Sequence, residues 1–271
     1  MPRDPLRTLA ELRNADGGFG PRPEAPSEPE ATAVAALALD DDRTRSWLAA
    51  NQQADGSFSI DVGPYVNDSA TALGALALPP GPERERALDH VESTRARHVD
   101  SSDAIPIDPS AIGWAWATGT ASWVEPTARA LWALRLTRPT SPHIADGVAL
   151  LRDRESVGGG WNYGNREVLG EPLPPFAQTT SIALVGLLDL DAELEERGLA
   201  ALSRLWPVES KGGLTLATAL LAFRAHRRTS EAAEVTTVLA SLVAETSLLG
   251  DVTALAWAAL SLAERPVGEA E

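Results

Sequence analysis

Cysteine is absent from the 271-residue chain. Its absence excludes disulfide bonds, thiol nucleophiles, cysteine-ligated zinc and iron–sulfur clusters. Long apolar runs are missing too: none approaches the roughly 20 residues that cross a bilayer, so no integral membrane segment is expected. The first residues, Met1 to Pro5, lack the apolar core of a signal peptide, and we therefore expect a cytoplasmic protein.

Positive charge is scarce. The chain has 23 Lys and Arg against 38 Asp and Glu, a net charge of −15, and Lys211 is its only lysine. A chain without a basic stripe does not suit nucleic acid or an anionic membrane surface, so neither is expected as a partner. Aromatic residues make up only 5 % of the sequence, yet eight of them are Trp against four Phe and two Tyr.

An internal repeat organises the sequence. A small or hydroxyl residue followed by an Ala- and Leu-rich stretch recurs at intervals of 36 to 58 residues, which is typical of repeated helix pairs. The copies are residues 32–37, 69–76, 127–134, 180–187, 218–223 and 253–260. They contain no internal Pro and are apolar nearly all round, which predicts buried helices. The segments between them, such as 83–92, carry charge on most faces and predict amphipathic covering helices.

The repeat predicts an all-α fold in one domain, residues 1–271. Six buried helices that alternate with six amphipathic ones describe an (α/α)6 toroid, with six inner and six outer helices. An open solenoid is the alternative, although its concave helices would face solvent and would be less apolar. The expected outer and inner partners are 5–14 with 29–39, 42–51 with 68–78, 82–97 with 124–136, 142–154 with 178–189, 191–205 with 213–226, and 230–245 with 250–264.

Three long insertions precede the inner helices of the second, third and fourth pairs, and we call them the second, third and fourth insertions: residues 57–67, 99–123 and 158–177. Each joins the end of an outer helix to the start of an inner one, so a toroid would gather them around one mouth of its central hole. Insertions of repeat proteins collect on the binding face. We therefore expect the functional residues at this mouth.

A second signature lies at the turns. Residues 48–58 end an outer helix in Gln-Gln and continue as Ala-Asp-Gly-Ser-Phe, and residues 12–20 and 150–161 are variants. This resembles the repeat of the prenyltransferase and squalene-oxidase superfamily, in which Gln is followed by Gly and then Trp or Phe. Squalene–hopene cyclases, oxidosqualene cyclases and protein prenyltransferase β-subunits share it. Residues 113–127 and 159–166 look like a bacterial, prenyltransferase-like branch.

The turn also has a physical interpretation. Gly supplies the positive φ that follows a helix end, and Asp binds nearby backbone donors. The aromatic residue then fills the gap between adjacent outer helices. On this interpretation Phe19, Phe58 and Trp161 are structural.

The sequence lacks the catalytic and metal-binding motifs known for the resembled families. Protein prenyltransferases and toroidal lanthionine cyclases hold zinc with Cys and His, whereas this chain has no Cys and four dispersed His, so no metal site or other cofactor is expected. The acidic D-x-D-D motif of class II terpene cyclases and the D-D-x-x-D magnesium motif of class I enzymes are both missing. The nearest clusters, Asp40 to Asp42 and Asp189 with Asp191, precede outer helices, and we interpret them as helix caps.

The mouth supplies the remaining candidates. Aromatic faces pack on isoprenoid chains and stabilise cations, so the insertions predict a ligand site. We expect the ligand-binding residues to be Tyr65, Trp114, Trp116, Trp123, Trp161, Asn162, Tyr163, Asn165 and Arg166. Structural filling is the competing role for these rings, and core filling is the expected role of Trp132 and Trp257.

Two carboxylates stand at the starts of inner helices, Asp68 and Glu125. They are the candidate catalytic acids, although a helix N-terminus favours their ionised form. Arg166 could bind a phosphate or carboxylate head group. Arg129 is the odd residue of an apolar inner helix, and we expect it either to reach the rim or to pair with a carboxylate such as Glu125 one turn earlier.

Two hypotheses follow. The resemblance implies a terpenoid cyclase- or prenyltransferase-like protein that binds an apolar, isoprenoid ligand in its central cavity, with an acid other than the D-x-D-D aspartate if it is an enzyme. The alternative is a noncatalytic toroid that binds a peptide or partner protein through its mouth insertions. A cavity of a few hundred Å³ with converging polar groups would favour the first.

Overall fold

The computed structural model describes residues 4–59, 68–246, 248 and 250–263. Within these residues it contains twelve α-helices and one hairpin made of two strands of two residues each. This confirms the all-α class and the expected helices. The first of each pair are α1 (Pro5–Glu11), α3 (Asp42–Asn51), α5 (Pro82–Ser93), α7 (His143–Asp153), α9 (Ala192–Leu205) and α11 (Thr229–Thr246). The second are α2 (Pro29–Leu39), α4 (Asp68–Ala77), α6 (Val124–Thr137), α8 (Ala177–Leu187), α10 (Gly213–Ala225) and α12 (Val252–Leu262).

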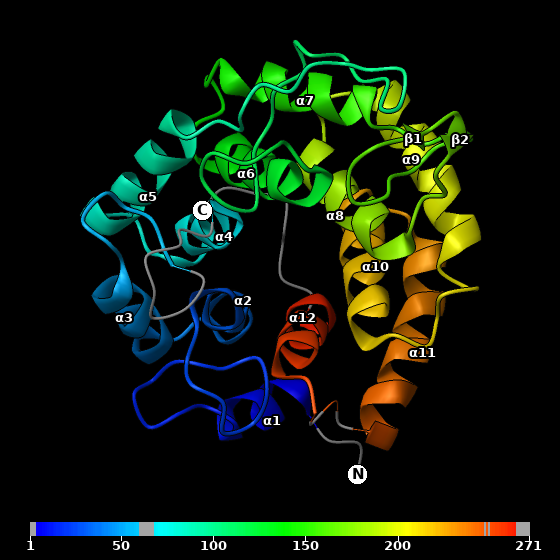
Figure 1. Cartoon of the computed structure of the whole chain (residues 1–271). Helices are drawn as coiled ribbons and strands as arrows, with labels where there is room; N and C mark the ends of the chain where they lie inside the picture. The colour runs from blue at the N-terminus through cyan, green and yellow to red at the C-terminus, as the bar shows by residue number, and fades with distance from the viewer. Residues whose placement is uncertain (1–3, 60–67, 247, 249, 264–271) are drawn as a thin grey trace.

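The second helices of the pairs surround a common centre, and we call them the inner helices (Figure 1). Each contacts the next, from α2 through α4, α6, α8 and α10 to α12, and α12 contacts α2 again. The remaining helices lie outside this ring, and five of them pack on the inner helix that precedes them in the chain: α3 on α2, α5 on α4, α7 on α6, α9 on α8 and α11 on α10. The expected partners, which joined each outer helix to the inner helix that follows it, therefore need correction. The first outer helix, α1, packs mainly on α12, so the first and the last of the twelve described helices are in contact.

Burial follows the expected pattern. Most residues of α2, α8 and α12 are buried, whereas α3 buries only Thr44, Trp47 and Leu48. The backbones of α6 and α8 pack in direct contact: a Cβ added to Gly186 in α8 would lie 2.4 Å from the carbonyl oxygen of Ala128 in α6. No helix in the described part of the chain is both long and apolar enough to cross a membrane.

Of the aspartates interpreted as caps of outer helices, Asp41 and Asp191 hold that position, whereas Asp40 ends α2 and Asp42 is the first residue of α3. Asp41 accepts hydrogen bonds from the backbone N–H groups of Arg43 and Thr44 at the start of α3. Asp191 accepts one from Leu194 at the start of α9. Their carboxylates thus satisfy helix donors that would otherwise lack partners.

One repeated hydrogen bond joins each long turn to the next inner helix. In four of the pairs the backbone N–H of a buried aromatic residue donates to a threonine hydroxyl in the first turn of the inner helix, at 2.9–3.0 Å. We call these aromatic residues the staples. The pairs are Phe19 with Thr32, Phe58 with Thr71, Trp114 with Thr127, and Trp161 with Thr180.

Two expectations about the outer connections need correction. The helix expected over 82–97 ends at Ser93, because the backbone of Ala96 and Arg97 pairs with Gly113 and Thr120 in the following insertion. The fourth insertion contains a hairpin, β1 (Glu167–Val168) and β2 (Glu171–Pro172), which we did not predict. Its turn residue Leu169 has φ +55°, a conformation rare for leucine, so the sequence carries no usual hairpin signal.

The turn glycine at position 56 is required for close packing. Gly56 has φ +89°, and a Cβ there would lie 2.0 Å from the carbonyl oxygen of Arg86 in α5. Gly56→Ala should therefore lower the free energy of unfolding by about 3 kcal/mol through backbone strain and overpacking together. Gly119→Ala is the matched control, because Gly119 has φ +79° but no atom within 4 Å of an added Cβ; it should cost about 1 kcal/mol. Equal costs in urea unfolding would contradict this account.

Asp16 predicts a pH dependence. Burial opposes its charge, but hydrogen bonds from the Gly18 backbone, the Ser27 hydroxyl and the Trp47 indole outweigh burial and hold the pKa of Asp16 below its ordinary 3.8. A pKa that is lower in the folded state than in the unfolded state stabilises the fold at pH values above the ordinary pKa. This stabilisation is lost as the pH falls through the lowered pKa. Asp16→Asn should therefore destabilise the protein near pH 7 and lose its effect as the pH falls below the ordinary 3.8 and through the lowered pKa. Asp103→Asn, at an exposed carboxylate, should change little at either pH.

Candidate functional site

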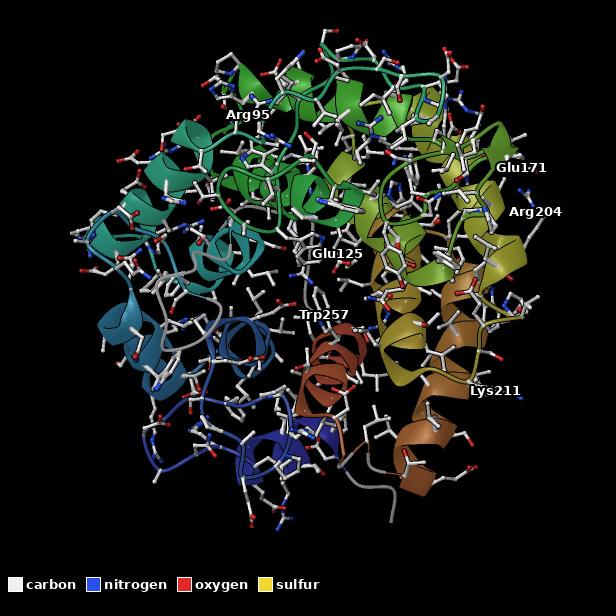
Figure 2. All side chains as sticks on the ribbon, in the orientation of Figure 1. Arg95, Glu125, Glu171, Arg204, Lys211 and Trp257 are labelled. Atoms are coloured by element: carbon white, nitrogen blue, oxygen red, sulfur yellow. The ribbon has the colours of Figure 1, made fainter. Side chains whose placement is uncertain are left out.

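A cavity of about 270 Å³ lies among the inner helices. Figure 2 shows the labelled side chains of Glu125 and Trp257 near the centre of the ring, whereas Arg95, Glu171 and Arg204 lie at its periphery. Eleven of the described residues line the cavity: Glu30, Trp116, Glu125, Arg129, Tyr163, Gln178, Ile182, Leu214, Thr218, Thr253 and Trp257. We call it the central cavity.

Helical periodicity explains the lining. Residues four apart lie on one face of a helix, and four inner helices each present such a pair to the cavity. The pairs are Glu125 with Arg129, Gln178 with Ile182, Leu214 with Thr218, and Thr253 with Trp257. Glu30 comes from the first turn of α2, while Trp116 and Tyr163 come from the third and fourth insertions.

Arg129 is the centre of a charged cluster. Its guanidinium donates to Glu125 at 2.5 Å and to Glu30 at 2.9 Å, and also to the Ser69 hydroxyl at 3.0 Å. It lies 5.7 Å from the ring centre of Trp116. Arg129 therefore pairs with a carboxylate, as one of the two expectations had it, and with a second carboxylate 99 positions earlier. We call Arg129, Glu125 and Glu30 the carboxylate–guanidinium triad.

The triad fixes the charge of the cavity. Burial opposes charge on Arg129, but the two carboxylates outweigh burial and raise the pKa of Arg129, so its guanidinium stays charged. The triad joins two carboxylates to one guanidinium, a formal charge of −1, and Glu125 accepts a hydrogen bond from Arg129 with one of its oxygens.

Aromatic rings surround the triad. Trp257 is buried and lines the cavity, and its ring centroid lies 6.3 Å from that of Trp132. Both are buried as expected, but Trp257 also contributes to the cavity wall. Tyr163 is about half exposed at 53 %, so one side of its ring remains open to solvent.

Asp68, the other candidate acid, does not line the central cavity. It is buried at the start of α4, where its carboxylate lies 3.0 Å from the His90 ring and accepts from the Thr118 hydroxyl at 3.2 Å. The opposite ring nitrogen of His90 lies 3.7 Å from Asp55. These contacts tie α4, α5 and two turns together, so Asp68 has a structural environment that the sequence did not indicate.

Two of the expected ligand-binding tryptophans are staples. The Trp114 indole N–H donates to the carbonyl of Val91, and the Trp161 indole N–H donates to that of Leu151, both at 2.7 Å. Neither ring lines the central cavity, and both are almost fully buried. Trp161 thus has the structural position expected for the turn aromatics, and Trp114 shares it.

The remaining expected residues lie on the fourth insertion and its neighbours. Asn162 shapes a turn: its side chain accepts from the Gly164 backbone and donates to the carbonyl of Asn165, both at 2.9 Å. Trp123 and Arg166 are exposed, and neither lines the central cavity. Tyr65 lies outside the described residues.

The sequence contained a signal for cavity residues that we did not use. Glu30, Glu125 and Gln178 each stand two positions before the threonine that accepts from a staple. In these three helices the threonine position therefore marks which residue faces the cavity. In α4 the residue two positions before the threonine is Ser69, which accepts from Arg129 but does not line the cavity. Thr218 and Thr253 lie on helices without such a staple bond among the described residues.

Within the described residues, no group of three or more His, Asp or Glu side chains could hold a metal ion. The polar residues of the lining are the triad, Gln178 with its amide, and three residues with hydroxyl groups, Tyr163, Thr218 and Thr253. These groups can hold a ligand by hydrogen bonds, while the aromatic rings and Leu214 and Ile182 pack on its apolar part.

No family model matches the sequence, and no curated protein matches it. Among solved structures, the chain is similar to a protein from Actinoplanes, with 15 % sequence identity and a TM-score of 0.58. The match covers 96 % of this chain and 98 % of the other. A likeness at this identity shows a shared fold alone.

The triad predicts a large stability effect at Arg129. Arg129→Met should lower the free energy of unfolding by about 3 kcal/mol, because it leaves two carboxylates without their cation. Adding Glu30→Gln and Glu125→Gln to this variant should restore most of the loss. Arg138→Met is the matched control: Arg138 binds three carboxylates, one more than Arg129, but near the surface, and its loss should cost about 1 kcal/mol or less. An Arg129→Met variant as stable as Arg138→Met would contradict the account.

Proposed function

We propose that the helix ring is an (α/α)6 toroid of the terpenoid cyclase and prenyltransferase type, and that its central cavity binds a small isoprenoid molecule that is neutral or cationic. The observation that carries this proposal is the triad beside three aromatic residues. The closed order of inner-helix contacts and the insertions that supply Trp116 and Tyr163 support it further.

The size of the cavity limits the ligand. A cavity of about 150 Å³ holds a benzene molecule. The central cavity has about 270 Å³, which corresponds to an apolar body of roughly ten carbon atoms. A two-isoprene chain matches this volume, whereas a thirty-carbon polyene exceeds it.

The charge of the cavity limits the head group. Arg129 already serves two carboxylates, so it has little attraction left for a diphosphate. A cation is favoured instead, both by the net negative triad and by the faces of Trp116 and Trp257. In a cyclase- or prenyltransferase-like reaction, these groups would stabilise positive charge on the substrate; they would not supply the initiating proton.

A second candidate function rests on exposed aromatic rings at the mouth. Tyr163 and Phe176 have ring centroids 5.2 Å apart, and Trp123 covers the backbone of Gly164 beside them. All three rings are exposed to solvent. Exposed aromatic clusters are typical of protein interaction surfaces, so a peptide or partner protein is the occupant we propose for this surface if the cavity binds nothing.

Three ligands with one hydrocarbon chain test the cavity: geranylamine, geraniol and geranyl diphosphate. We expect geranylamine to bind with the highest affinity in calorimetry, geraniol about tenfold more weakly, and the diphosphate not measurably. Glu30→Gln should weaken geranylamine about tenfold and leave geraniol nearly unchanged, because it removes charge and keeps the volume.

Trp123→Ala is the matched control for the mouth. It should leave geranylamine binding unchanged, because Trp123 does not line the cavity. Absence of binding by all three ligands would overturn the cavity proposal. Preference for the diphosphate would overturn the charge assignment.

A further inference from the structure

A second pocket, of about 150 Å³, lies in the third insertion, and it shares no lining residue with the central cavity. We call it the insertion pocket. Its apolar wall is formed by Val99, Ile105, Ile107, Pro109, Ala111, Ile112, Ala121 and Trp123. Its polar groups belong to Arg97, Asp108, Ser122, Arg154 and Asn165, and Gly164 completes the lining.

Hydrogen bonds between distant segments hold the walls. The backbone N–H of Asp108 donates to the Asp153 carboxylate at the end of α7 at 3.1 Å. The backbone N–H of Leu169, in the hairpin turn, donates to the carbonyl of Ala104 at 2.8 Å. A bridge between Ser102 and Ile105 folds the insertion on itself. The pocket is therefore assembled from the third insertion, the fourth insertion and the end of α7.

Arg154 gives this pocket its chemical character. Only 5 % of the residue is exposed. Its Nη1 donates to Asp153 at 2.6 Å, while its buried Nε has no hydrogen-bond partner among the described residues. A guanidinium binds best to an acceptor with two oxygen atoms in the plane of its fork. Asp153 does not fill that role alone, because its other oxygen accepts from Asp108.

The described charged residues that line the insertion pocket are two arginines, Arg97 and Arg154, and one aspartate, Asp108, so the pocket has a formal charge of +1 in an acidic protein. Burial chiefly lowers the pKa of Arg154, and the nearby charge of Arg166 lowers it further, whereas Asp153 and Asp108 oppose this effect. Arg97 also lines the pocket. Asp108 is itself held by the Ser110 backbone and hydroxyl, which lower its pKa and keep it ionised. A monoanion suits this balance better than a phosphate or diphosphate.

We propose that the insertion pocket binds a small carboxylic acid with a short branched or aromatic apolar group. The carboxylate receives hydrogen bonds from Arg154, and the apolar group packs against Ile105, Ile107 and Trp123. A cavity of this volume accommodates a body about the size of benzene, so the ligand carries roughly six carbon atoms beside its carboxylate. The buried guanidinium, short of acceptors in the free protein, gains them from the ligand.

Matched probes separate charge from shape. Benzoate and 4-methylpentanoate should bind at least tenfold more tightly than benzamide and 4-methylpentanamide in calorimetry on the full chain. Acetate and inorganic phosphate should bind at least tenfold more weakly than either acid, because acetate lacks the apolar group and phosphate carries too much charge. Equal binding of acids and amides would overturn the assignment of Arg154.

Variants locate the binding. Arg154→Met should weaken benzoate at least tenfold, and Ile105→Trp, which keeps Arg154 and fills the pocket, should do the same. Arg152→Met is the matched control, since Arg152 is exposed and pairs with Asp191 outside the pocket; it should change nothing. Retained binding in Ile105→Trp, with the fold intact by circular dichroism, would overturn the proposal.

Two further outcomes are decisive. Glu30→Gln should leave benzoate binding unchanged, which separates this pocket from the central cavity; a loss equal to that of Arg154→Met would overturn the proposal. A short peptide that ends in a free leucine carboxylate offers the same chemistry from another source. Binding of that peptide tenfold tighter than 4-methylpentanoate would show that the occupant is a chain end and would overturn the small-acid assignment.

Discussion

The hydrogen bond between a staple N–H and a threonine hydroxyl sets the register of the ring. It fixes where an inner helix begins relative to the turn before it, and it does so four times in the described chain. The residue two positions earlier is then directed toward the centre, which is how Glu30, Glu125 and Gln178 come to line one cavity. Which side chains line the central cavity therefore depends on hydrogen bonds that are themselves buried.

Much of the fold could be predicted because its determinants are local. Runs rich in Ala and Leu predict the inner helices, and Asp41 and Asp191 cap outer helices as their positions indicate. The pairing of Arg129 with Glu125 was predictable because the two residues stand one helical turn apart. Helix ends were less predictable where tertiary contacts compete, as at Ala96, whose backbone pairs with the third insertion.

The candidate site was harder to predict because its contacts are not local. Glu30 reaches Arg129 across 99 positions, and Asp68 meets His90 from a different helix. Trp114 and Trp116 stand two residues apart in the sequence, yet the first is a staple and the second lines the cavity. Residue type and spacing alone did not distinguish these two roles. The threonine position in each repeat does, because it identifies the staple.

The contact between α1 and α12 has a consequence for how the chain folds during synthesis. The helix α1 packs mainly on α12, which is synthesised well after it, and α2 also has α12 as a neighbour. An open array of repeats can add units one by one and needs a polar cap at each end. A closed order of contacts leaves the sides of α1 and α2 that pack on α12 uncovered until α12 has been synthesised. The interval before closure is thus the time at which this chain is most exposed to aggregation and proteolysis.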